Sequence, residues 1–354
     1  MTSRLKINRR DFARGLSVAG VAALAAPAVF TGRSHASDSR LTITSWGGSY
    51  HDMVRRVFVD PFTAETGIQV QMVDNGDMAK VKAQVLSNAV DWDVIDAPAG
   101  FATSGVKENL WEELDPSLAT MEGLLQQPHT HYMPIYLYSG GLLWHAERTP
   151  DGKHPVDFAG FFDVEQFPGR RCMRSLAQET LEMALVADGV APADLYPLDV
   201  ERAFAKLDQI KPHVSKFAAS TPEQSASVAQ NEADFSYSYY NRVKAFQDNG
   251  TPLDFSFEQT NNALDFFAVP RGSKNKEAAM RFIEFALRPE QQKAWALAGF
   301  YMPNHVATLN EIRKSPEGSY LPDLESGKNV IVDPEWWGDN LTEVQRRYSE
   351  WMIS

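Results

Sequence analysis

The feature that most constrains the fold is an alternation of strand-like and helix-like segments in the first part of the chain. Residues 41–46 alternate apolar and polar side chains, as a half-buried strand does, and end at two glycines. Apolar residues at helical spacing follow over 53–62, and the pattern then repeats with a strand over 68–73, a helix over 78–89 and a strand over 92–95. This order and spacing predict right-handed crossovers and a parallel sheet, so the fold class is α/β.

Ligands of open α/β sheets bind at the carboxyl ends of the strands. In this chain the first strand is followed by Trp46 and two glycines, and the third strand ends at Asp96. Both residues therefore belong to the edge of the sheet where a ligand would lie. Position alone predicts that Trp46 lines a pocket.

The first 36 residues have the three-part layout of an export signal. A basic start, Arg4–Arg14, precedes an apolar stretch over 16–30 that is too short and too weakly hydrophobic for a comfortable membrane span, and a cleavage site follows near Ala36. The surroundings of Arg9 and Arg10 resemble the twin-arginine (Tat) motif; the alternative is an ordinary signal with adjacent arginines. Either way, we predict that the mature chain works in the periplasm.

The charge of the chain argues against nucleic acid as a partner. The 354 residues have a net charge of −12, and the part that follows the basic first 36 residues has a net charge of −17. So acidic a protein repels phosphate backbones. The length is large for a single core and suits two lobes.

The sequence contains few motifs that are typical of catalytic, metal-binding or cofactor-binding sites. Cys172 is the only cysteine, so no intrachain disulfide can form, and we expect a buried, unreactive thiol. His129 and His131 share a polar loop, and two histidines at this spacing are weak grounds for a metal site. The sequence contains no nucleophile motif, phosphate loop or dinucleotide fingerprint. We therefore predict no catalytic residue, no metal and no cofactor.

The remainder of the chain continues the mixed pattern of helices and strands. Asn340 and Glu343 form a capping pair for a last helix. Before it, the spacing of apolar residues predicts helices over 177–187, 200–210 and 275–287 and strands over 234–239 and 263–270.

Short segments in a fixed order resemble the spermidine/putrescine-type branch of the solute-binding proteins of ABC importers. No single segment is specific, but their order and spacing across the chain are. The segments are Ser45-Trp-Gly-Gly-Ser-Tyr50, Pro61-Phe-Thr-Ala-Glu-Thr-Gly-Ile68, Gly250-Thr-Pro252, Asp265-Phe-Phe-Ala-Val-Pro270, Asn275-Lys-Glu277, Leu287-Arg-Pro289, Met302-Pro-Asn304 and Tyr320-Leu-Pro-Asp323.

The resemblance implies a periplasmic-binding-protein fold of type 2. Each of two lobes would be a mostly parallel sheet flanked by helices, with hinge strands between the lobes and the ligand held between them. The first lobe would comprise 37–140 and 264–306, and the second 141–263 and 307–354 with the closing hinge and helix. Hinge closure of two such lobes is an established property of this class. The expected partners are a small molecule and an inner-membrane ABC permease, and the expected state is a monomer.

The resemblance also indicates residues that would hold an amine. By the resemblance, Asp265 matches the position whose carboxylate binds the ammonium group of the ligand. A buried carboxylate is costly unless it is paired, so a cationic ligand would be its natural partner. Trp46, Tyr50 and Tyr240 match or nearly match aromatic positions around alkylammonium ligands, where ring faces attract cations. Packing in the core is the alternative for Tyr50 and Trp46.

Two departures from the polyamine receptors affect the expected ligand. Glu179 matches an acidic position, but Leu176 stands where the polyamine receptors have a further acid. Arg242 stands in a turn that carries no arginine in the family, and its guanidinium could bind a carboxylate in a fork. Arg242 with Asp265 would suit a zwitterion such as a γ-amino acid better than a diamine; an ion pair with a protein acid, or exposure, is the alternative for Arg242.

Weaker candidates and other functions complete the hypotheses. Ser45, Asp96 and Ser139 could add hydrogen bonds to a ligand. A ferric-ion receptor is an alternative function, because the phenolates of Tyr237, Tyr239 and Tyr240 would suit a hard cation. An exported enzyme of similar shape is less favoured, since the sequence lacks a catalytic constellation.

Overall fold

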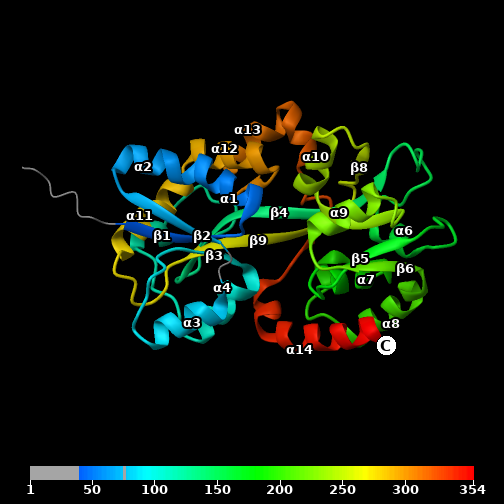
Figure 1. The fold of residues 1–354 in the computed structure, drawn as a ribbon, viewed down its shortest axis with the longest axis horizontal. Helices are drawn as coiled ribbons and strands as arrows, with labels where there is room; N and C mark the ends of the chain where they lie inside the picture. Colours follow the sequence, from blue (N-terminus) through cyan, green and yellow to red (C-terminus); the bar gives the residue numbers. More distant parts are fainter. Residues whose placement is uncertain (1–39, 75–76) are drawn as a thin grey trace, which may run out of the picture. The chain divides into compact units, whose positions relative to one another are not determined.

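The computed structural model describes residues 40–74 and 77–354, which belong to one compact unit. The export signal predicted for residues 1–36 lies outside the described residues. Two lobes, each with its own hydrophobic core, share the long strands β4 (Tyr132–His145) and β9 (Asn261–Ala268), which run from one lobe into the other (Figure 1).

The first lobe contains the segment from which the sequence predicted an α/β fold. Strands β1 and β2 pair in parallel, and one continuous helical stretch joins them and ends at Gly67, whose φ of 76° closes the last turn. The elements of this lobe are β1 (Arg40–Ser45), α1 (Gly48–Val54), the π-helical η1 (Arg55–Val59), α2 (Asp60–Thr66), β2 (Gln69–Asp74), α3 (Met78–Leu86), β3 (Ile95–Pro98), α4 (Ala99–Lys107), α5 (Pro116–Ala119), α11 (Lys276–Ala286), α12 (Pro289–Gly299), β10 (Met302–Pro303), α13 (Val306–Arg313) and η4 (Pro316–Tyr320).

The second lobe is built from the middle of the chain and its C-terminal end. Its parallel strands β7, β5 and β6 lie side by side next to β4. The elements of this lobe are α6 (Phe158–Phe162), β5 (Arg171–Arg174), α7 (Thr180–Ala187), η2 (Pro192–Asp194), α8 (Val200–Ile210), η3 (Lys211–His213), β6 (Val214–Ala218), α9 (Thr221–Ala229), β7 (Phe235–Tyr239), α10 (Tyr240–Asp248), β8 (Leu253–Phe255), β11 (Val330–Ile331) and α14 (Pro334–Ile353).

The sheet of β1 and β2 is parallel, whereas the larger sheet contains both parallel and antiparallel pairs. The order of the larger sheet is β11-β9-β4-β7-β5-β6, with β3 on β9 and both β8 and β10 on β4. Its antiparallel pairings all involve β4 or β9. A strand that leaves a lobe and a strand that returns to it run in opposite directions, so the connection between the lobes introduces the antiparallel pairs.

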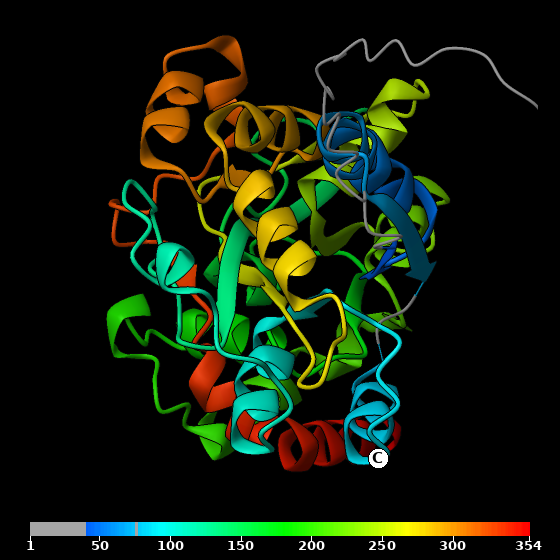
Figure 2. The same ribbon diagram turned by 90° about the vertical axis from the view of Figure 1, so that its left-hand side faces the viewer.

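Aromatic side chains fill the core of the first lobe. Phe58 stacks on Trp295 with ring centroids 4.7 Å apart, and Phe62 meets Phe282 edge to face. Helix α11 thereby covers one face of the lobe, as Figure 2 shows from that side. Burying aromatic rings of this size contributes strongly to stability.

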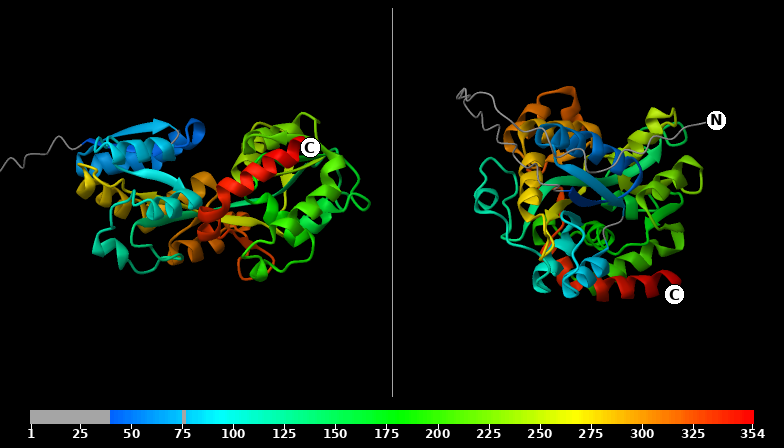
Figure 3. Two further views of the ribbon diagram at one scale, coloured as in Figure 1. Left: turned by 90° about the horizontal axis from the view of Figure 1, so that it is seen from below. Right: turned by 60° about the vertical axis from the view of Figure 1, so that its left-hand side comes forward.

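Helix α14 connects the two lobes. It starts at Pro334, earlier than the Asn340–Glu343 pair predicted, because Asp333 caps it by accepting the backbone N–H groups of its first turn. Thr103 of α4 donates to the carbonyl of Pro334 at 3.0 Å, and the rest of the helix lies along the second lobe (Figure 3).

One boundary differs from the division predicted from the sequence. All of helix α13 after its first residue, Val306, falls in 307–354, which the sequence assigned to the second lobe. The helix packs on α12, however, and Leu309 is buried in a core cluster of the first lobe. In the part of the chain that the structure describes, no helix is both long and apolar enough to cross a membrane.

Candidate ligand-binding site between the lobes

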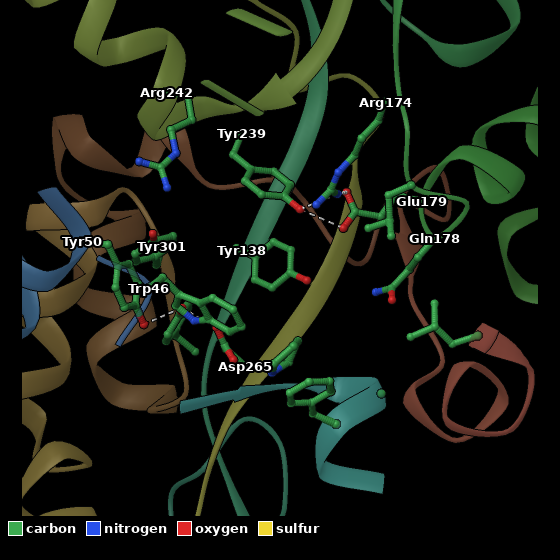
Figure 4. Close-up of a pocket in the computed structure, with 16 residues that line it drawn as sticks. Trp46, Tyr50, Tyr138, Arg174, Gln178, Glu179, Tyr239, Arg242, Asp265 and Tyr301 are labelled. Carbon is green, nitrogen blue, oxygen red and sulfur yellow. Dashed lines mark hydrogen bonds and ion pairs between the residues drawn. The ribbon is translucent and has the colours of Figure 1, made fainter. Parts of the chain in front are cut away.

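A cavity of about 370 Å³ lies between the two lobes, where both contribute to its wall. A volume of this order suits a small organic molecule. Figure 4 shows the side chains around it. The first lobe contributes Trp46, Tyr50, Pro98, Gly100, Phe101 and Tyr301; the shared strands contribute Tyr136, Tyr138 and Asp265; the second lobe contributes Arg174, Leu176, Gln178, Glu179, Tyr239, Arg242 and Leu341.

Trp46 reaches the cavity from the turn that follows β1. Gly47 and Gly48 have φ angles of 75° and 55°, which lie in the left-handed region that glycine adopts without steric cost. The chain can therefore turn directly from the strand into α1. The Trp46 side chain stays 38% exposed at the wall of the cavity, where its ring can cover a ligand.

Asp265 forms the acidic side of the cavity. Its position in β9 is opposite Tyr136 of β4 on one side and Pro98 of β3 on the other. Its Oδ2 accepts the Tyr136 hydroxyl at 2.6 Å, and its Oδ1 accepts the backbone N–H of Phe266 at 3.2 Å. Both oxygens of this buried carboxylate therefore have donors, while the side chain still borders the cavity.

A second carboxyl, Asp96 of β3, lies behind Asp265. Its Oδ2 is 2.7 Å from the hydroxyl of Tyr50, which is 2.9 Å from the hydroxyl of Tyr136. Burial raises the pKa of Asp265 to about 6. Burial, and then the neighbouring charge of Asp265, raise the pKa of Asp96 well above its ordinary value, whereas the Trp46 side chain lowers the pKa of both carboxyls.

Arg242 forms the basic side of the cavity. It lies in the first turn of α10, and Figure 4 shows its guanidinium directed into the space between Tyr239 and Tyr301, across the pocket from Asp265. Among the described residues no carboxylate forms an ion pair with Arg242, and its buried Nε lacks a hydrogen-bond partner. A guanidinium left in this way is ready to bind a carboxylate of a ligand.

Arg174 and Glu179, which also line the cavity, form an ion pair in which their charges cancel. The Arg174 guanidinium lies 3.4 Å from the Glu179 carboxylate and donates a hydrogen bond to the Tyr239 hydroxyl at 2.8 Å. Glu179 also accepts the hydroxyls of Tyr237 at 2.6 Å and Tyr239 at 3.0 Å. At Gly140 a Cβ would lie 1.8 Å from the Tyr237 hydroxyl, so a glycine is needed beside this cluster.

The structure places several predicted site residues away from the cavity wall. The Tyr240 side chain packs in an aromatic cluster, where it stacks on Tyr320 at a centroid distance of 4.9 Å. Tyr239, at the end of β7, faces the cavity, so the side chain of the next residue points away from it. Ser139 donates to Asn262 at 2.7 Å. Ser45 and Asp96 are buried without lining the cavity.

The three tyrosines proposed for iron do not converge on a point. The hydroxyls of Tyr237 and Tyr239 are both bound to Glu179, and Tyr240 lies in another cluster. Burial raises the pKa of Tyr237 and Tyr239, which disfavours the phenolates that iron(III) requires. This geometry gives the ferric-ion alternative no support.

Several residues of the cavity were missed in the sequence. Tyr136 and Tyr138 are two apart in β4, so period-two alternation could have placed them on one face beside the ligand. Tyr301 follows α12 and was overlooked next to the matched Met302-Pro-Asn304 segment. Arg174 carried no local signal, because its partner Glu179 becomes its neighbour only through the turn before α7.

Fold and cavity together define a two-lobed binding protein for a small molecule, and comparisons with known proteins agree. The model of the bacterial extracellular solute-binding protein family matches residues 58–317. The γ-aminobutyric acid-binding protein of Pseudomonas aeruginosa is 33% identical over 91% of this chain and 93% of its own length. The spermidine/putrescine-binding periplasmic protein of Escherichia coli is 24% identical over 93% of this chain and 94% of its own length.

Solved structures show the same likeness. A GABA receptor superposes with a TM-score of 0.81 at 31% identity, covering 89% of this chain and 98% of that receptor. The AgtB protein of A. tumefaciens, in complex with agropinic acid, gives a TM-score of 0.76 at 31% identity, with coverage of 89% and 99%. The chain therefore belongs to the bacterial extracellular solute-binding proteins, the substrate-binding proteins of ABC transporters, which confirms the family and the two-lobed fold predicted from the sequence.

Proposed function

We propose that this protein is the periplasmic receptor of an ABC importer for a zwitterionic γ-amino acid, with γ-aminobutyrate as the first candidate. One observation carries the proposal: of the charged side chains on the cavity wall, Arg174 and Glu179 pair with each other, whereas Asp265 and Arg242 have no ion-pair partner among the described residues. An ammonium group at Asp265 and a carboxylate at Arg242 would satisfy both charges at once.

A polyamine fits the same cavity less well. A long polycation needs a carboxylate at each end, but Glu179 is already neutralised by Arg174, and Leu176 offers no charge. Arg242 would also repel a second ammonium group. The higher identity to a γ-aminobutyric acid-binding relative than to the spermidine/putrescine-binding relatives supports the same choice.

The aromatic lining accounts for the carbon chain of such a ligand. Trp46, Tyr138 and Tyr239 lie between the acidic and basic sides of the cavity in the view of Figure 4. Their ring faces can cover methylene groups, and a ring beside an ammonium group adds about 0.5–2 kcal/mol of attraction. We propose that these rings hold the methylenes while the two charges fix the ends.

Calorimetric titration of the purified protein tests the proposal. We expect γ-aminobutyrate to bind and putrescine to bind far more weakly. The comparison should include amino acids with shorter and longer chains, because the separation between Asp265 and Arg242 selects the length. Tight binding of putrescine or spermidine without any binding of γ-aminobutyrate would contradict the zwitterion but not the receptor class.

The affinity for γ-aminobutyrate should depend on pH. Because burial raises the pKa of Asp265 to about 6, the carboxylate is lost as the pH falls through that value, whereas the ligand keeps its ammonium charge. Below this point we expect the dissociation constant to rise by up to about tenfold for each pH unit. The groups that face Asp265 are Tyr136 of β4, Asp96 of β3 and Trp46. The raised pKa of Asp265 already includes the effects of all three.

Titrations at a series of pH values should compare the wild-type protein with Asp265→Asn. The residual affinity of the variant should lack the acidic transition. An equal decline in both proteins would assign the transition to another group.

Export and assembly are proposed on sequence grounds. We propose that the protein is exported to the periplasm, acts as a monomer and delivers its ligand to an inner-membrane permease. We propose lobes of 37–140 with 264–306 and of 141–263 with 307–354, except that α13 and η4 belong with the first lobe.

Replacement of Arg9 and Arg10 by lysines tests the export route. If the twin-arginine pathway is used, the variant should accumulate in the cytoplasm, since that pathway reads the arginine pair. Fractionation followed by immunoblotting measures the distribution. An unchanged periplasmic yield would mean that an ordinary signal is at work.

A further inference from the structure

The acidic side of the cavity contains a continuous chain of four polar side chains. The carboxyl of Asp96 is 2.7 Å from the Tyr50 hydroxyl, the two tyrosine hydroxyls are 2.9 Å apart, and the Tyr136 hydroxyl is 2.6 Å from the Asp265 carboxyl. Each of these distances is that of an O–H···O hydrogen bond. All four groups are buried, so water does not offer an easy substitute for any of the contacts.

This hydrogen-bond chain needs one proton more than the two tyrosine hydroxyls supply when both carboxyls are ionised. Each tyrosine hydroxyl has one hydrogen to donate. If both carboxyls were ionised, Tyr50 would donate to Asp96 and Tyr136 to Asp265, and no hydrogen would remain for the 2.9 Å contact between the two phenol oxygens. Three short contacts require three hydrogens, so one of the carboxyls must bring the third.

The contacts of the two carboxyls indicate which of them is protonated. Asp265 has a donor for each oxygen, Tyr136 and the backbone N–H of Phe266, as an ionised carboxylate requires. Asp96 has a buried Oδ1 that lacks a hydrogen-bond partner among the described residues. An oxygen that accepts no hydrogen bond destabilises a buried ionised carboxylate much more than it destabilises a neutral carboxyl. The arrangement therefore favours a protonated Asp96 that donates to Tyr50.

We propose that Asp96 and Asp265 hold one proton between them through Tyr50 and Tyr136, so that the acidic side of the site offers a ligand a single negative charge, on Asp265. This inference rests on the proposed function, in which Asp265 binds the ammonium group. Asp96 is then a positioning residue: its O–H orients Tyr50, Tyr50 orients Tyr136, and Tyr136 donates to the ligand-binding carboxylate.

Within residues 40–74 and 77–354, no lysine or arginine forms an ion pair with Asp96 or Asp265. Burial raises the pKa of both Tyr50 and Tyr136 most, and the neighbouring carboxyls raise it further. Tyr301, whose ring centroid is 4.4 Å from that of Tyr136, adds to the same shift. The hydroxyl of Thr44 accepts the backbone N–H of Asp96, and the groups that lower the pKa of its carboxyl, Tyr50 and Trp46, are neutral. A charge of −1 matches one ammonium group, so the shared proton selects monoamines against diamines.

Infrared difference spectroscopy on the ligand-free protein at neutral pH tests the proton directly. We expect the carbonyl stretch of a protonated carboxylic acid in the wild type and its loss in Asp96→Asn. Spectra of the two proteins that are identical in this region would overturn the proposal.

Affinities for γ-aminobutyrate provide the second readout. Asp96→Leu removes the donor to Tyr50 and is expected to weaken binding by about tenfold. Asp96→Asn restores an uncharged donor and should bring the loss back to within about threefold, whereas Asp265→Asn should weaken binding by at least about thirtyfold. A loss in Asp96→Asn as large as that in Asp265→Asn would mean that both carboxyls are charged, and would overturn the proposal.

The two hypotheses fail in different ways. If the wild-type protein does not bind γ-aminobutyrate but shows the carboxylic acid band that Asp96→Asn lacks, the proposed ligand is wrong and the shared proton is supported. If the wild type binds the ligand but the band is absent, the receptor assignment stands and the shared proton is overturned.

Discussion

Replacing Arg242 by methionine is expected to weaken the binding of γ-aminobutyrate by at least about thirtyfold, and to leave putrescine binding unchanged or tighter. Removing one partner of a desolvated charge pair typically costs about 2–5 kcal/mol, because the remaining charge stays buried and unpaired. Methionine keeps much of the volume of the side chain and removes both its charge and its donors. For a diamine the same change removes a repulsion.

Two further variants make the result specific. Arg242→Lys keeps the charge but loses the planar fork, so we expect an intermediate loss. Arg346→Met removes an arginine on the exposed face of α14, where it pairs with Glu343 and Glu350, and should not change the affinity. Calorimetry at constant salt measures all of them. Wild-type affinity in Arg242→Met would place the carboxylate of the ligand elsewhere.

Asp265→Asn is expected to weaken the binding of γ-aminobutyrate and of putrescine alike, by at least about thirtyfold. Asparagine has nearly the same shape and can still accept the Tyr136 hydroxyl, so the variant removes the charge with little change in packing. It should not lower the melting temperature of the ligand-free protein.

The expected stability of this variant follows from the sign of the pKa shift. The folded-state pKa of Asp265 is raised to about 6 by burial, so the folded state binds the proton more tightly than the unfolded chain does. Its contribution to the free energy of unfolding is therefore most favourable at low pH and is lost as the pH rises through about 6. At neutral pH the ionised side chain is a cost to folding, and asparagine relieves it.

Asp254→Asn is a matched control for the loss of binding. Asp254 also lies in a strand and accepts the backbone N–H of the next residue, at 2.8 Å, but it is exposed on β8. We expect wild-type affinity in this control. If Asp265→Asn bound γ-aminobutyrate as well as Asp254→Asn did, the ammonium site would have to lie elsewhere in the cavity.

The local pattern of apolar and polar residues was sufficient to predict many of the helices and strands. The alternation over 41–46 and the helical spacing over 53–62 predicted β1 and the helices that follow it, because side chains on one face of an element repeat with its period. The same reasoning could not predict that β4 and β9 pair antiparallel across both lobes, since strand partners distant in sequence leave no local signal. It also could not assign α13 to a lobe, because the packing of Leu309 decides that question.

The sequence by itself determined the family, from the order and spacing of short segments, and the resemblance to that family implied the two lobes. Periodicity along the chain determined the position of Trp46 at a strand end. Only the tertiary structure decided which charges are available to a ligand. Glu179 and Arg242 were both candidates in the sequence, yet Glu179 is neutralised by Arg174, whereas Arg242 has no such partner among the described residues. The energy of a buried charge depends on the groups within a few ångströms of it, and that distance is a property of the folded chain.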